Sequence, residues 1–558
     1  MISRLQALGR SVSGFGLILG SLCFAASLTP SLIPRDFVVQ GVLAGIAFGA
    51  GYGIGVLLCS VWRYLELPSL TQQLTKILSL IMAAICLLIM VLALNQSAHW
   101  QNSVRHAVGM ESVESGYPLS VTLIAIICFC VLLLIARGLI KLGKLIAGKL
   151  YRRFPRRISI VVGAAVTIAL TYTIANGVLV RYTFNMLDSS FRQIDALIEP
   201  DRPQPLVAER AGNKLSRLEW RKLGRAGREF VASGPTAQEI TAFTKQPALE
   251  PIRLYAGLQI ADTPEERAAL LLEELIALKA FERDALVIIT PTGTGWVDPS
   301  AIDGLEFLFN GNVASVALQY SYLNSPLSLI FEPEHGAVAA EALFRVVYRY
   351  WKTLPADQRP KLYLHGLSLG AFNSQRAITF FDVLGDPIDG AVWSGPPFPS
   401  EKWRSLTADR NPESTEWLPV FQEGRFVRFM NQHGTPEGNT SPWGNLRFVY
   451  LQYGSDAITF FDKSLFYREA DWMKAPRAPD VSPLLRWYPV VSMLQLLIDM
   501  PLSDGVPMGY GHVYAPEHYL NAWLEVTGVE WAPEKVDALK ALLRQRSTQG
   551  EGYEYRGG

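Results

Sequence analysis

Five apolar stretches follow one another in the first third of the chain. They cover residues 12–33, 37–62, 74–95, 119–140 and 158–180. Each is close to the roughly 20 residues that an α-helix needs to cross a bilayer, so the pattern predicts five transmembrane helices. Arg4 and Arg10 before the first stretch are also typical of a signal peptide, but no clear small-residue cleavage site precedes the second stretch. We therefore interpret the first stretch as a span.

Basic residues indicate how these helices are oriented. Residues 137–157 carry eight Lys or Arg and no acid, whereas residues 95–118 carry Arg105 against Glu111 and Glu114. Because short loops rich in Lys and Arg remain in the cytoplasm, residues 137–157 and the N-terminus are expected inside. An odd number of spans then places everything after residue 184 on the outer face.

The second predicted span carries glycines at every fourth position. Gly41, Gly45, Gly49 and Gly53 occupy one helical stripe, and small residues at this spacing allow helix backbones to approach closely. We expect this stripe to pack against neighbouring helices.

The pattern changes after a polar linker near residues 188–206. Short β-branched runs at residues 252–258, 285–290, 313–318 and 361–364 read as strands, and residues 264–281 and 333–351 read as helices. This alternation predicts a mostly parallel sheet with helices on both faces, an α/β fold. The expected organisation is a transmembrane domain at 1–184, a linker and pre-domain segment at 185–250, and a catalytic domain at 251–558 with cap-like insertions near 396–445 and 463–505.

Composition separates the same two parts. Residues 1–184 have a net charge of +11 and the remainder −10, within a chain that is 49% hydrophobic and only 18% charged. A nucleic-acid partner is therefore not expected for the acidic part. All five cysteines lie in apolar stretches at or before Cys130, so neither a disulfide framework nor a zinc knuckle is expected. We expect no metal and no cofactor.

A candidate nucleophile lies where a predicted strand runs into a helix. The sequence Gly366-Leu-Ser368-Leu-Gly370 follows the strand at 361–364, and Gly-x-Ser-x-Gly in this context is typical of a nucleophile elbow. The two glycines make room for neighbouring backbone, so the turn can present the serine hydroxyl above the sheet. The alternative is a glycine-flanked serine in an ordinary strand-to-helix turn.

An acid and a base should follow the serine in the order Ser, Asp, His. Asp456 comes after a predicted strand at 446–452, so it is expected at the carboxyl edge of the sheet, although it could also be a turn-forming aspartate. His512 lies in the glycine-rich loop 508–514 before a helix that starts near Pro516, whereas His518 would lie on that helix. We therefore expect His512 to be the base.

The remaining catalytic-domain histidines are expected to have other roles. His335 and His365 precede or adjoin the nucleophile and are interpreted as structural, and His433 falls in the expected insertion at 396–445.

Acyl transfer also requires donors aimed at the developing oxyanion. The residue after the nucleophile, Leu369, should supply one backbone N–H, and the loop after the strand at 285–290 should supply another through Gly293 or Thr294. A phosphate-binding reading of this glycine loop fails because no Gly-Lys-Ser/Thr follows it.

An apolar stretch at 482–501 invites a sixth transmembrane assignment, which we reject. Arg486, Pro489 and Asp499 interrupt it, and a crossing there would put Ser368 and His512 on opposite sides of the membrane. The stretch is either a core helix or part of a cap that lines an acyl-binding pocket.

Several motifs together resemble the bacterial membrane-bound α/β-hydrolases that have an N-terminal multi-span transmembrane domain. They are Ser-Leu-Thr-Pro-Ser-Leu-Ile-Pro-Arg35, the glycine-rich residues 40–55, Leu-Gly-Arg-Ala-Gly-Arg228-Glu-Phe-Val, Thr-Gly-Thr-Gly-Trp-Val-Asp298, the Ser368 pentapeptide and Gly511-His512. The resemblance covers nearly the whole chain. It implies a serine hydrolase domain behind a multi-span anchor in the bacterial cytoplasmic (inner) membrane, with Ser368, Asp456 and His512 at the triad positions.

The sequence thus predicts a membrane-anchored serine hydrolase, facing the periplasmic side, that cleaves esters through an acyl-enzyme, with lipid esters as the favoured substrates. Its expected partners are the ester substrate and the bilayer. A lipid transacylase that uses the same acyl-enzyme and a non-catalytic receptor or scaffold on a hydrolase fold are the alternatives. The sequence sets neither the acyl length and headgroup of the substrate nor the oligomeric state.

Overall fold

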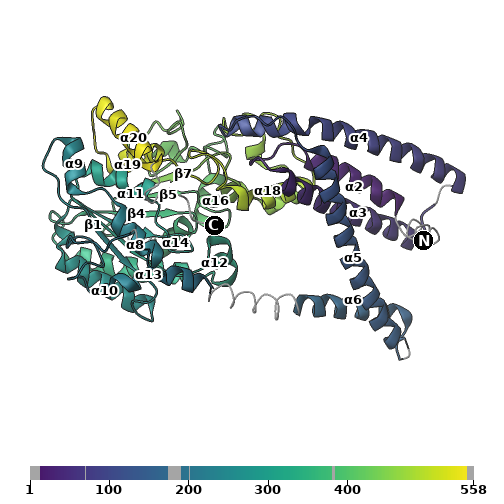
Figure 1. Ribbon diagram of the computed structural model, residues 1–558, viewed down its shortest axis with the longest axis horizontal. Coiled ribbons are helices and arrows are strands. Elements are labelled where there is room, and N and C mark those ends of the chain that lie inside the picture. Colours follow the sequence, from purple (N-terminus) through teal and green to yellow (C-terminus); the bar gives the residue numbers. More distant parts are fainter. Residues whose placement is uncertain are drawn as a thin grey trace. The chain divides into compact units, whose positions relative to one another are not determined.

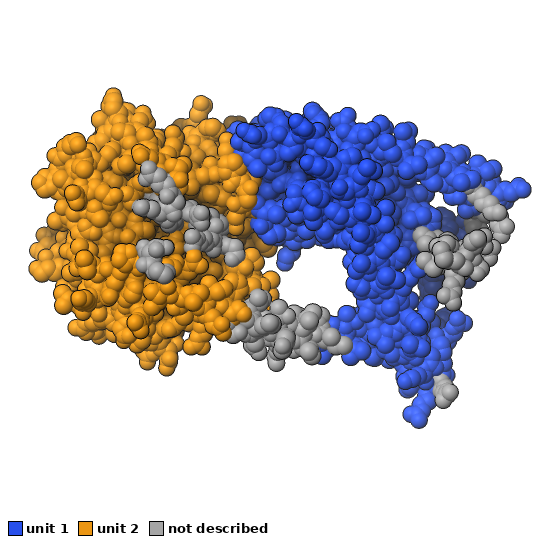
Figure 2. All heavy atoms as spheres, viewed as in Figure 1, with its two compact units in different colours: residues 1–183, 461–502 blue, residues 184–460, 503–558 orange. Residues whose placement is uncertain are grey.

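The computed structural model describes residues 13–68, 71–151, 153–173, 190–199, 202–379 and 384–548. The chain divides into two compact units (Figure 2). Unit 1 comprises residues 1–183 and 461–502, and unit 2 comprises residues 184–460 and 503–558.

Unit 1 is helical. Its principal helices are α2 (Gly14–Ser27), α3 (Phe37–Tyr64), α4 (Gln72–Ala107), α5 (Pro118–Leu150), α6 (Arg156–Thr173) and α18 (Val491–Asp499). Within the described part of the chain, the four helices α3 to α6 are long and apolar enough to cross a membrane. Their outward side chains include many exposed leucine, isoleucine and valine residues, which is the surface expected of helices that contact lipid.

The first predicted span is shorter than the pattern indicated. Helix α2 has 14 residues, or about 21 Å at 1.5 Å per residue, against a bilayer core of roughly 30 Å. It ends before a segment that contains Pro30 and Pro34, and Asp36 then caps α3 by accepting hydrogen bonds from the Val38 and Val39 N–H groups at 2.7 and 2.9 Å. The five-span count stays a prediction. Residues 174–180 of the last predicted span lie outside the described residues.

The glycines of α3 face two different neighbours. A Cβ atom at Gly41 or Gly45 would lie 2.7 Å from Ile124 or 2.6 Å from Cys128, both on α5. At Gly51, by contrast, it would lie 2.6 Å from the backbone oxygen of Leu19 on α2. The predicted close packing is therefore present, but α3 uses glycines on two faces to hold α2 and α5. Gly53, the last residue of the predicted stripe, has no neighbour of this kind.

The segment 461–502 belongs to unit 1 although it interrupts the sequence of unit 2. Gln495 Nε2 on α18 donates to the Thr29 backbone oxygen at 3.0 Å. Asp499 Oδ2 accepts hydrogen bonds from the backbone N–H groups of Leu32 and Ile33 at 3.1 and 3.4 Å. Helix α18 has nine residues and is only about 14 Å long, too short for the sixth span that the sequence analysis also rejected.

A buried ion pair joins this segment to the loop between α2 and α3. Arg35 Nε lies 3.7 Å from Asp499 Oδ1, and both side chains are fully buried. Arg35 Nη2 also donates to Ser31 Oγ at 2.7 Å. The apolar stretch at 482–501 is thus packed on the ends of α2 and α3, where its polar residues have specific partners.

Unit 2 contains a seven-stranded sheet in which every pair of neighbouring strands is parallel. The strand order is β1-β3-β2-β4-β5-β7-β6. The strands are β1 (Ile252–Ala256), β2 (Ala285–Thr290), β3 (Val313–Leu318), β4 (Lys361–Leu367), β5 (Gly390–Ser394), β6 (Val427–Met430) and β7 (Arg447–Leu451). The predicted α/β fold is confirmed, and the predicted bounds of β2 and β3 agree with the structure.

Helices cover both faces of the sheet (Figure 1). One group, whose members contact one another or strands β1 to β4, consists of α10 (Pro264–Ala277), α13 (His335–Thr353) and α14 (Leu369–Ala377). A second group, packed on one another and on β5 and β7, consists of α11 (Pro299–Leu308), α19 (Pro516–Thr527) and α20 (Pro533–Thr548). The other helices of unit 2 include α8 (Gly224–Ser233), α9 (Ala237–Thr244), α12 (Ser325–Phe331), α16 (Glu401–Ala408) and α17 (Ala457–Phe460).

Two segments of unit 2 differ from the expected organisation. The segment 396–445, expected as a cap-like insertion, also supplies β6 to the sheet. The segment 185–250, expected as a linker and pre-domain, contains α8 and α9 and is part of unit 2. Strands β5 and β6 were not recognised in the sequence, although β5 has five residues, as many as the predicted strands β1 and β7.

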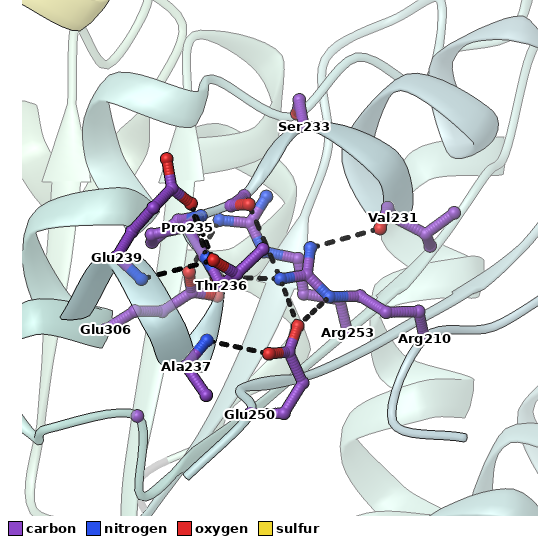
Figure 3. A network of polar contacts seen from close by, with 12 residues as sticks. Arg210, Val231, Ser233, Pro235, Thr236, Ala237, Glu239, Glu250, Arg253 and Glu306 are labelled. Carbon is purple, nitrogen blue, oxygen red and sulfur yellow. Dashed lines mark hydrogen bonds and ion pairs between the residues drawn. The ribbon is translucent and has the colours of Figure 1, made fainter. Parts of the chain in front are cut away.

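Buried arginines tie the 185–250 segment to the sheet (Figure 3). Arg253 on β1 donates from Nη1 to the Phe230 backbone oxygen of α8 at 2.9 Å. It also donates from Nε to Glu306 and from Nη2 to Asp303, each at 2.7 Å, and all three charged side chains are fully buried. Next to it, Arg210 pairs with Glu250 at 2.8 Å and donates to the Val231 backbone oxygen at 3.1 Å. Because each buried guanidinium meets a carboxylate and backbone oxygens, the network satisfies its own charge.

The buried pair in unit 1 generates a stability prediction. Asp499→Asn keeps an oxygen for the Leu32 and Ile33 N–H groups but leaves the Arg35 charge buried without a counter-ion, so we expect a loss of about 3–5 kcal/mol in unfolding free energy. The double variant Arg35→Met/Asp499→Asn should lose less than Asp499→Asn alone. Denaturation of the full chain in detergent measures both.

A matched control removes an exposed ion pair instead. Glu341→Gln breaks the contact with Arg345 on the surface of α13, and exposed pairs contribute at most about 1 kcal/mol. If Asp499→Asn were no more destabilising than Glu341→Gln, the Arg35–Asp499 pair would not hold the segment in place.

Candidate active site

Ser368 lies on a strained turn between β4 and α14. Its backbone angles are φ 55° and ψ −123°, a region that residues with a side chain rarely occupy. Its N–H donates to the Ser394 backbone oxygen at 3.0 Å, which fixes the turn against the end of β5. The predicted strand-turn-helix context of the nucleophile elbow is therefore present.

The flanking glycines are required by close backbone packing. A Cβ atom at Gly366 would lie 2.3 Å from the Gly370 carbonyl carbon, and one at Gly370 would lie 2.1 Å from the Thr290 backbone oxygen. Both distances are too short for any side chain. The start of α14 is thus pressed against the elbow itself and against the end of β2.

Asp456 follows β7 and is completely buried. Its Oδ1 accepts hydrogen bonds from the backbone N–H groups of Ile458 and Thr459 at 2.9 and 3.3 Å. Its Oδ2 accepts from Thr459 Oγ1 at 3.1 Å, from Tyr514 Oη at 2.8 Å and pairs with His512 Nδ1 at 2.7 Å. Asp456 is therefore more than a turn-forming residue, because one carboxylate anchors both its own turn and a distant imidazole.

His512 is buried in the loop before α19. Its backbone N–H donates to the Ser503 oxygen at 2.9 Å, and the preceding Gly511 N–H donates to Ser455 Oγ at 2.9 Å. Since a carboxylate only accepts, the contact with Asp456 assigns the proton to Nδ1 and leaves Nε2 as the basic nitrogen.

Ser368 and His512 both lie against the end of β5. A Cβ atom at Gly395 would lie 2.6 Å from His512 Cε1, and the neighbouring residue Ser394 accepts the hydrogen bond from the Ser368 N–H. Parallel pairing brings the ends of β4, β5 and β7 to one edge of the sheet, so the loops that carry Ser368 and Asp456 start at the same edge, one strand apart.

Neighbouring carboxylates favour the protonated form of His512. Burial opposes the charged imidazolium, but the Asp456 carboxylate and, beyond it, Asp504 outweigh this effect and raise the pKa of His512. Asp504 is itself perturbed: burial raises its pKa to about 6, with a further increase from Asp456 and an opposing effect of His512.

The other histidines named in the sequence analysis have different surroundings. His518 lies on α19, as expected, and its Nδ1 is 2.6 Å from Tyr453 Oη. His365 is buried with Nδ1 at 2.9 Å from the Val392 oxygen, and burial lowers its pKa to about 4. His335 is at the exposed start of α13 beside Glu332, and the His433 backbone N–H donates to Asn431.

The loop after β2 is held by hydrogen bonds that define its shape. Gly295 has φ 85°, and its backbone oxygen accepts from Tyr255 Oη at 2.7 Å. Gln319 Nε2 donates to the Thr294 oxygen at 3.3 Å, and the Gly293 N–H donates to Ser325 Oγ at 3.2 Å. Because the Gly293 N–H already has an acceptor, Thr294 is the better candidate of the two for the second oxyanion donor.

Three polar residues around the acid and base escaped the sequence analysis. Thr459 and Tyr514 donate to Asp456, and Ser455 supports the loop that carries His512. Tyr514 lies two residues after His512, but nothing in the pattern indicates that its hydroxyl turns towards an acid 58 residues away.

A cavity of about 420 Å³ adjoins α14. Phe372, one helical turn after Ser368, lines it together with Arg376 and Lys402. Within the described part of the chain, no group of three or more His, Cys, Asp or Glu side chains is arranged to hold a metal ion.

Comparison with known protein families gives two adjoining matches. Residues 28–235 match the N-terminal region of an α/β-hydrolase family, and residues 252–539 match its α/β-hydrolase region. No curated protein and no solved structure matches the chain. The second match alone covers more than half of the 558 residues, so the chain, with its parallel sheet and its serine on the turn after β4, belongs to the α/β-hydrolase family.

Proposed function

We propose that the protein is a membrane-anchored serine hydrolase that cleaves esters through an acyl-enzyme. The observation that carries this proposal is the 2.7 Å contact between His512 Nδ1 and Asp456, in a site where Ser368 lies on a strained turn next to the same end of the sheet. Nucleophile, base and orienting acid on three separate loops follow the triad logic of this fold.

In the proposed reaction, Ser368 Oγ attacks the ester carbonyl carbon and His512 Nε2 takes the serine proton. The tetrahedral intermediate collapses when the bond to the alcohol oxygen breaks, and the imidazolium returns the proton to that oxygen. Water then attacks the acyl-enzyme by the same route and releases the carboxylic acid. Asp456 keeps its contact with His512 Nδ1 throughout and stabilises the imidazolium.

The charge on the intermediate needs donors at fixed positions. Leu369 N–H at the start of α14 and Thr294 N–H in the loop after β2 are the proposed pair. Hydrogen bonds from Tyr255 and Gln319 fix the loop that carries Thr294. The packing of Gly370 on the Thr290 oxygen fixes the start of α14, which carries Leu369. Donors that are fixed before substrate arrives require no reorganisation during the reaction.

Lipid esters are the proposed substrates. The support is the attachment of the hydrolase region to a unit with four helices suited to a membrane, which would keep the enzyme at a lipid surface. The apolar stretch at 482–501 gives less support than its sequence suggested, because Gln495 and Asp499 bind it to the ends of α2 and α3.

The proposed location is the bacterial cytoplasmic (inner) membrane with the hydrolase domain on the periplasmic side. The basic residues 137–157 support this orientation, since they end α5 and begin α6. The segment 461–502 is consistent with it, because this segment is flanked in sequence by the hydrolase domain and binds the loop between α2 and α3, which the charge pattern places outside.

We expect Ser368→Ala to abolish labelling of the purified protein by a fluorophosphonate probe, because the probe reacts only with an activated serine. Ser368→Ala and His512→Ala should each lower kcat for a short p-nitrophenyl ester by roughly 10⁶ if the three residues act as a unit. The rates of labelling and of ester hydrolysis measure these effects.

His518→Ala is the matched control for the base. His518 is bound to Tyr453 rather than to Asp456, so its removal should leave labelling in place. A labelled His512→Ala together with an unlabelled His518→Ala would show that the base is assigned wrongly, and an unlabelled parent protein would favour a non-catalytic scaffold.

Activity should fall in acid because the base must be neutral, and the raised pKa of His512 sets where it falls. Asp504→Asn removes one of the charges that raise this pKa, so the acid limb of kcat/KM should move to lower pH. Asp537→Asn on the exposed face of α20 is the control and should leave the limb where it is. A limb that is unmoved or moves to higher pH in Asp504→Asn would contradict the electrostatic account.

The orientation has its own test. A reporter that is active only outside the cytoplasm should be active when fused after Gly558 and silent when fused near Arg153, because the basic loop is expected to remain inside. An active fusion near Arg153 would refute the orientation while leaving the proposed chemistry untouched.

A further inference from the structure

A pocket of about 150 Å³ in unit 2 borders the loop that carries the proposed oxyanion donor, and we call it the Thr294 pocket. Thr294 and Trp296 of this loop line it together with Tyr322, which lies in the loop after β3. The helical residues 190–196 and α8 supply the other lining residues. Because the loops after β2 and β3 start at the carboxyl edge of the parallel sheet, the pocket lies at the same edge as Ser368, where ligands bind in folds of this kind.

The strand order places the Thr294 pocket and His512 on opposite sides of Ser368. The elements around the pocket are the loops after β2 and β3 and helix α8, which contacts β1. His512 lies against the end of β5, on the other side of β4 in the order β1-β3-β2-β4-β5. In the proposed reaction His512 returns its proton to the alcohol oxygen, so the alcohol part of an ester belongs on the β5 side. The part that reaches the Thr294 pocket is then the acyl chain.

Aromatic and branched apolar side chains from three segments line the pocket. They are Phe191, Ile194, Trp296 and Tyr322. Trp296 is buried, Phe191 and Tyr322 are half-buried, and Ile194 is 45% exposed. Burial of apolar surface contributes about 25 cal/mol for each Å² that is removed from water, so this lining favours a hydrocarbon ligand.

The charged residues of the lining have partners of their own. Asp195 Oδ1 accepts the Arg225 backbone N–H at 2.9 Å, and the Arg225 side chain pairs through Nε with Glu199 at 2.9 Å. Glu229 Oε2 lies 3.6 Å from Arg202 Nη1. Because acids and bases meet one another around the pocket, the lining does not favour a charged ligand.

The glycine-containing motif at the start of α8 holds the pocket together. A Cβ atom at Gly224 would lie 2.5 Å from Asp195 Oδ2, and one at Gly227 would lie 2.4 Å from the Tyr255 ring. The Tyr255 hydroxyl in turn donates to the Gly295 oxygen at 2.7 Å. Helix α8 therefore fixes both its own wall of the pocket and, through Tyr255, the loop after β2. The pocket is thus formed before a ligand arrives, as binding sites for small molecules usually are.

Apolar surface continues along the chain from Ile194. Leu197 and Ile198 are 63% and 46% exposed, and they belong to the segment that follows α6 in sequence. A pocket of about 150 Å³ holds roughly five groups the size of a water molecule, at about 30 Å³ each. A long acyl chain would therefore place its first carbons in the pocket and continue over these exposed side chains.

We propose that the Thr294 pocket is the acyl-chain subsite of the enzyme, with Ile194 and Trp296 beside the hydrocarbon that follows the ester carbonyl. This inference rests on the proposed function, because it takes Ser368 as the nucleophile and His512 as the base. It adds the residues that select the acyl group: a chain that reaches Ile194 gains apolar contacts that an acetyl group lacks.

Ile194→Asp in the full chain in detergent tests the subsite. A carboxylate at this position faces the hydrocarbon of a long ester, so the ratio of kcat/KM for p-nitrophenyl octanoate to that for p-nitrophenyl acetate should fall. We expect a fall of about tenfold, or about 1.4 kcal/mol, the contribution of roughly two buried methylene groups. Ile276→Asp is the matched control, because Ile276 on α10 is 41% exposed and does not line the pocket. It should leave the ratio within about twofold of the parent value.

A crosslinking experiment reports on the pocket without turnover. The Ser368→Ala chain is irradiated with an octanoyl ester that carries a mid-chain diazirine, and the labelled peptides are identified by mass spectrometry. We expect label on residues 190–196 or on Trp296 and Tyr322. The experiment needs no pocket variant, so it also decides the question should Ile194→Asp fail to fold.

The subsite is overturned by an unchanged ratio in Ile194→Asp, by an equal fall in Ile276→Asp, or by label confined to other parts of the chain. Failure of the proposed function looks different, because the parent protein would then hydrolyse neither ester. Label on residues 190–196 would in that case support an apolar binding pocket without catalysis, and label elsewhere would overturn the pocket as well.

Discussion

The close contact of three backbones around Ser368 is the constraint on which the rest of the site depends. Gly370 lies against the Thr290 oxygen, and Gly366 lies against the carbonyl of Gly370, so the end of β2, the end of β4 and the start of α14 leave no space for a side chain. This packing stabilises a serine backbone at φ 55°, which would otherwise cost of the order of 1–3 kcal/mol. It also places the loop after β2 beside the first N–H groups of α14, the arrangement that an oxyanion site requires.

Asp456 is the second fixed point. Its carboxylate accepts two backbone N–H groups and the hydroxyls of Thr459 and Tyr514, in addition to its contact with His512. A carboxylate held by this many donors cannot rotate freely, so it fixes both the tautomer and the ring orientation of the histidine. The proposed chemistry uses three side chains, but their positions depend on a larger group of residues that make no contact with substrate.

The acid and the base are separated in sequence by a segment that belongs to the other unit. Between Asp456 and His512 the chain runs through residues 461–502. This segment binds the loop between α2 and α3 in unit 1 through Gln495 and through Asp499, which pairs with the buried Arg35. The loops that carry Asp456 and His512 are therefore continuous in sequence with a segment that belongs to unit 1.

The sequence by itself determined the features that arise from local patterns. The apolar lengths predicted α3 to α6, the β-branched runs predicted β2 and β3 to the residue, and the glycine spacing around Ser368 predicted the elbow, because helix length, strand period and turn geometry depend on neighbouring residues. The tertiary structure alone decided which distant groups meet. The Tyr514 hydroxyl donates to Asp456, and the Gly293 N–H donates to Ser325. Strand β7 pairs with β5, which leaves β6 at the edge of the sheet, and the apolar stretch at 482–501 belongs to unit 1. Those outcomes depend on contacts between segments tens to hundreds of residues apart, and packing between such segments has no periodic signature in the sequence.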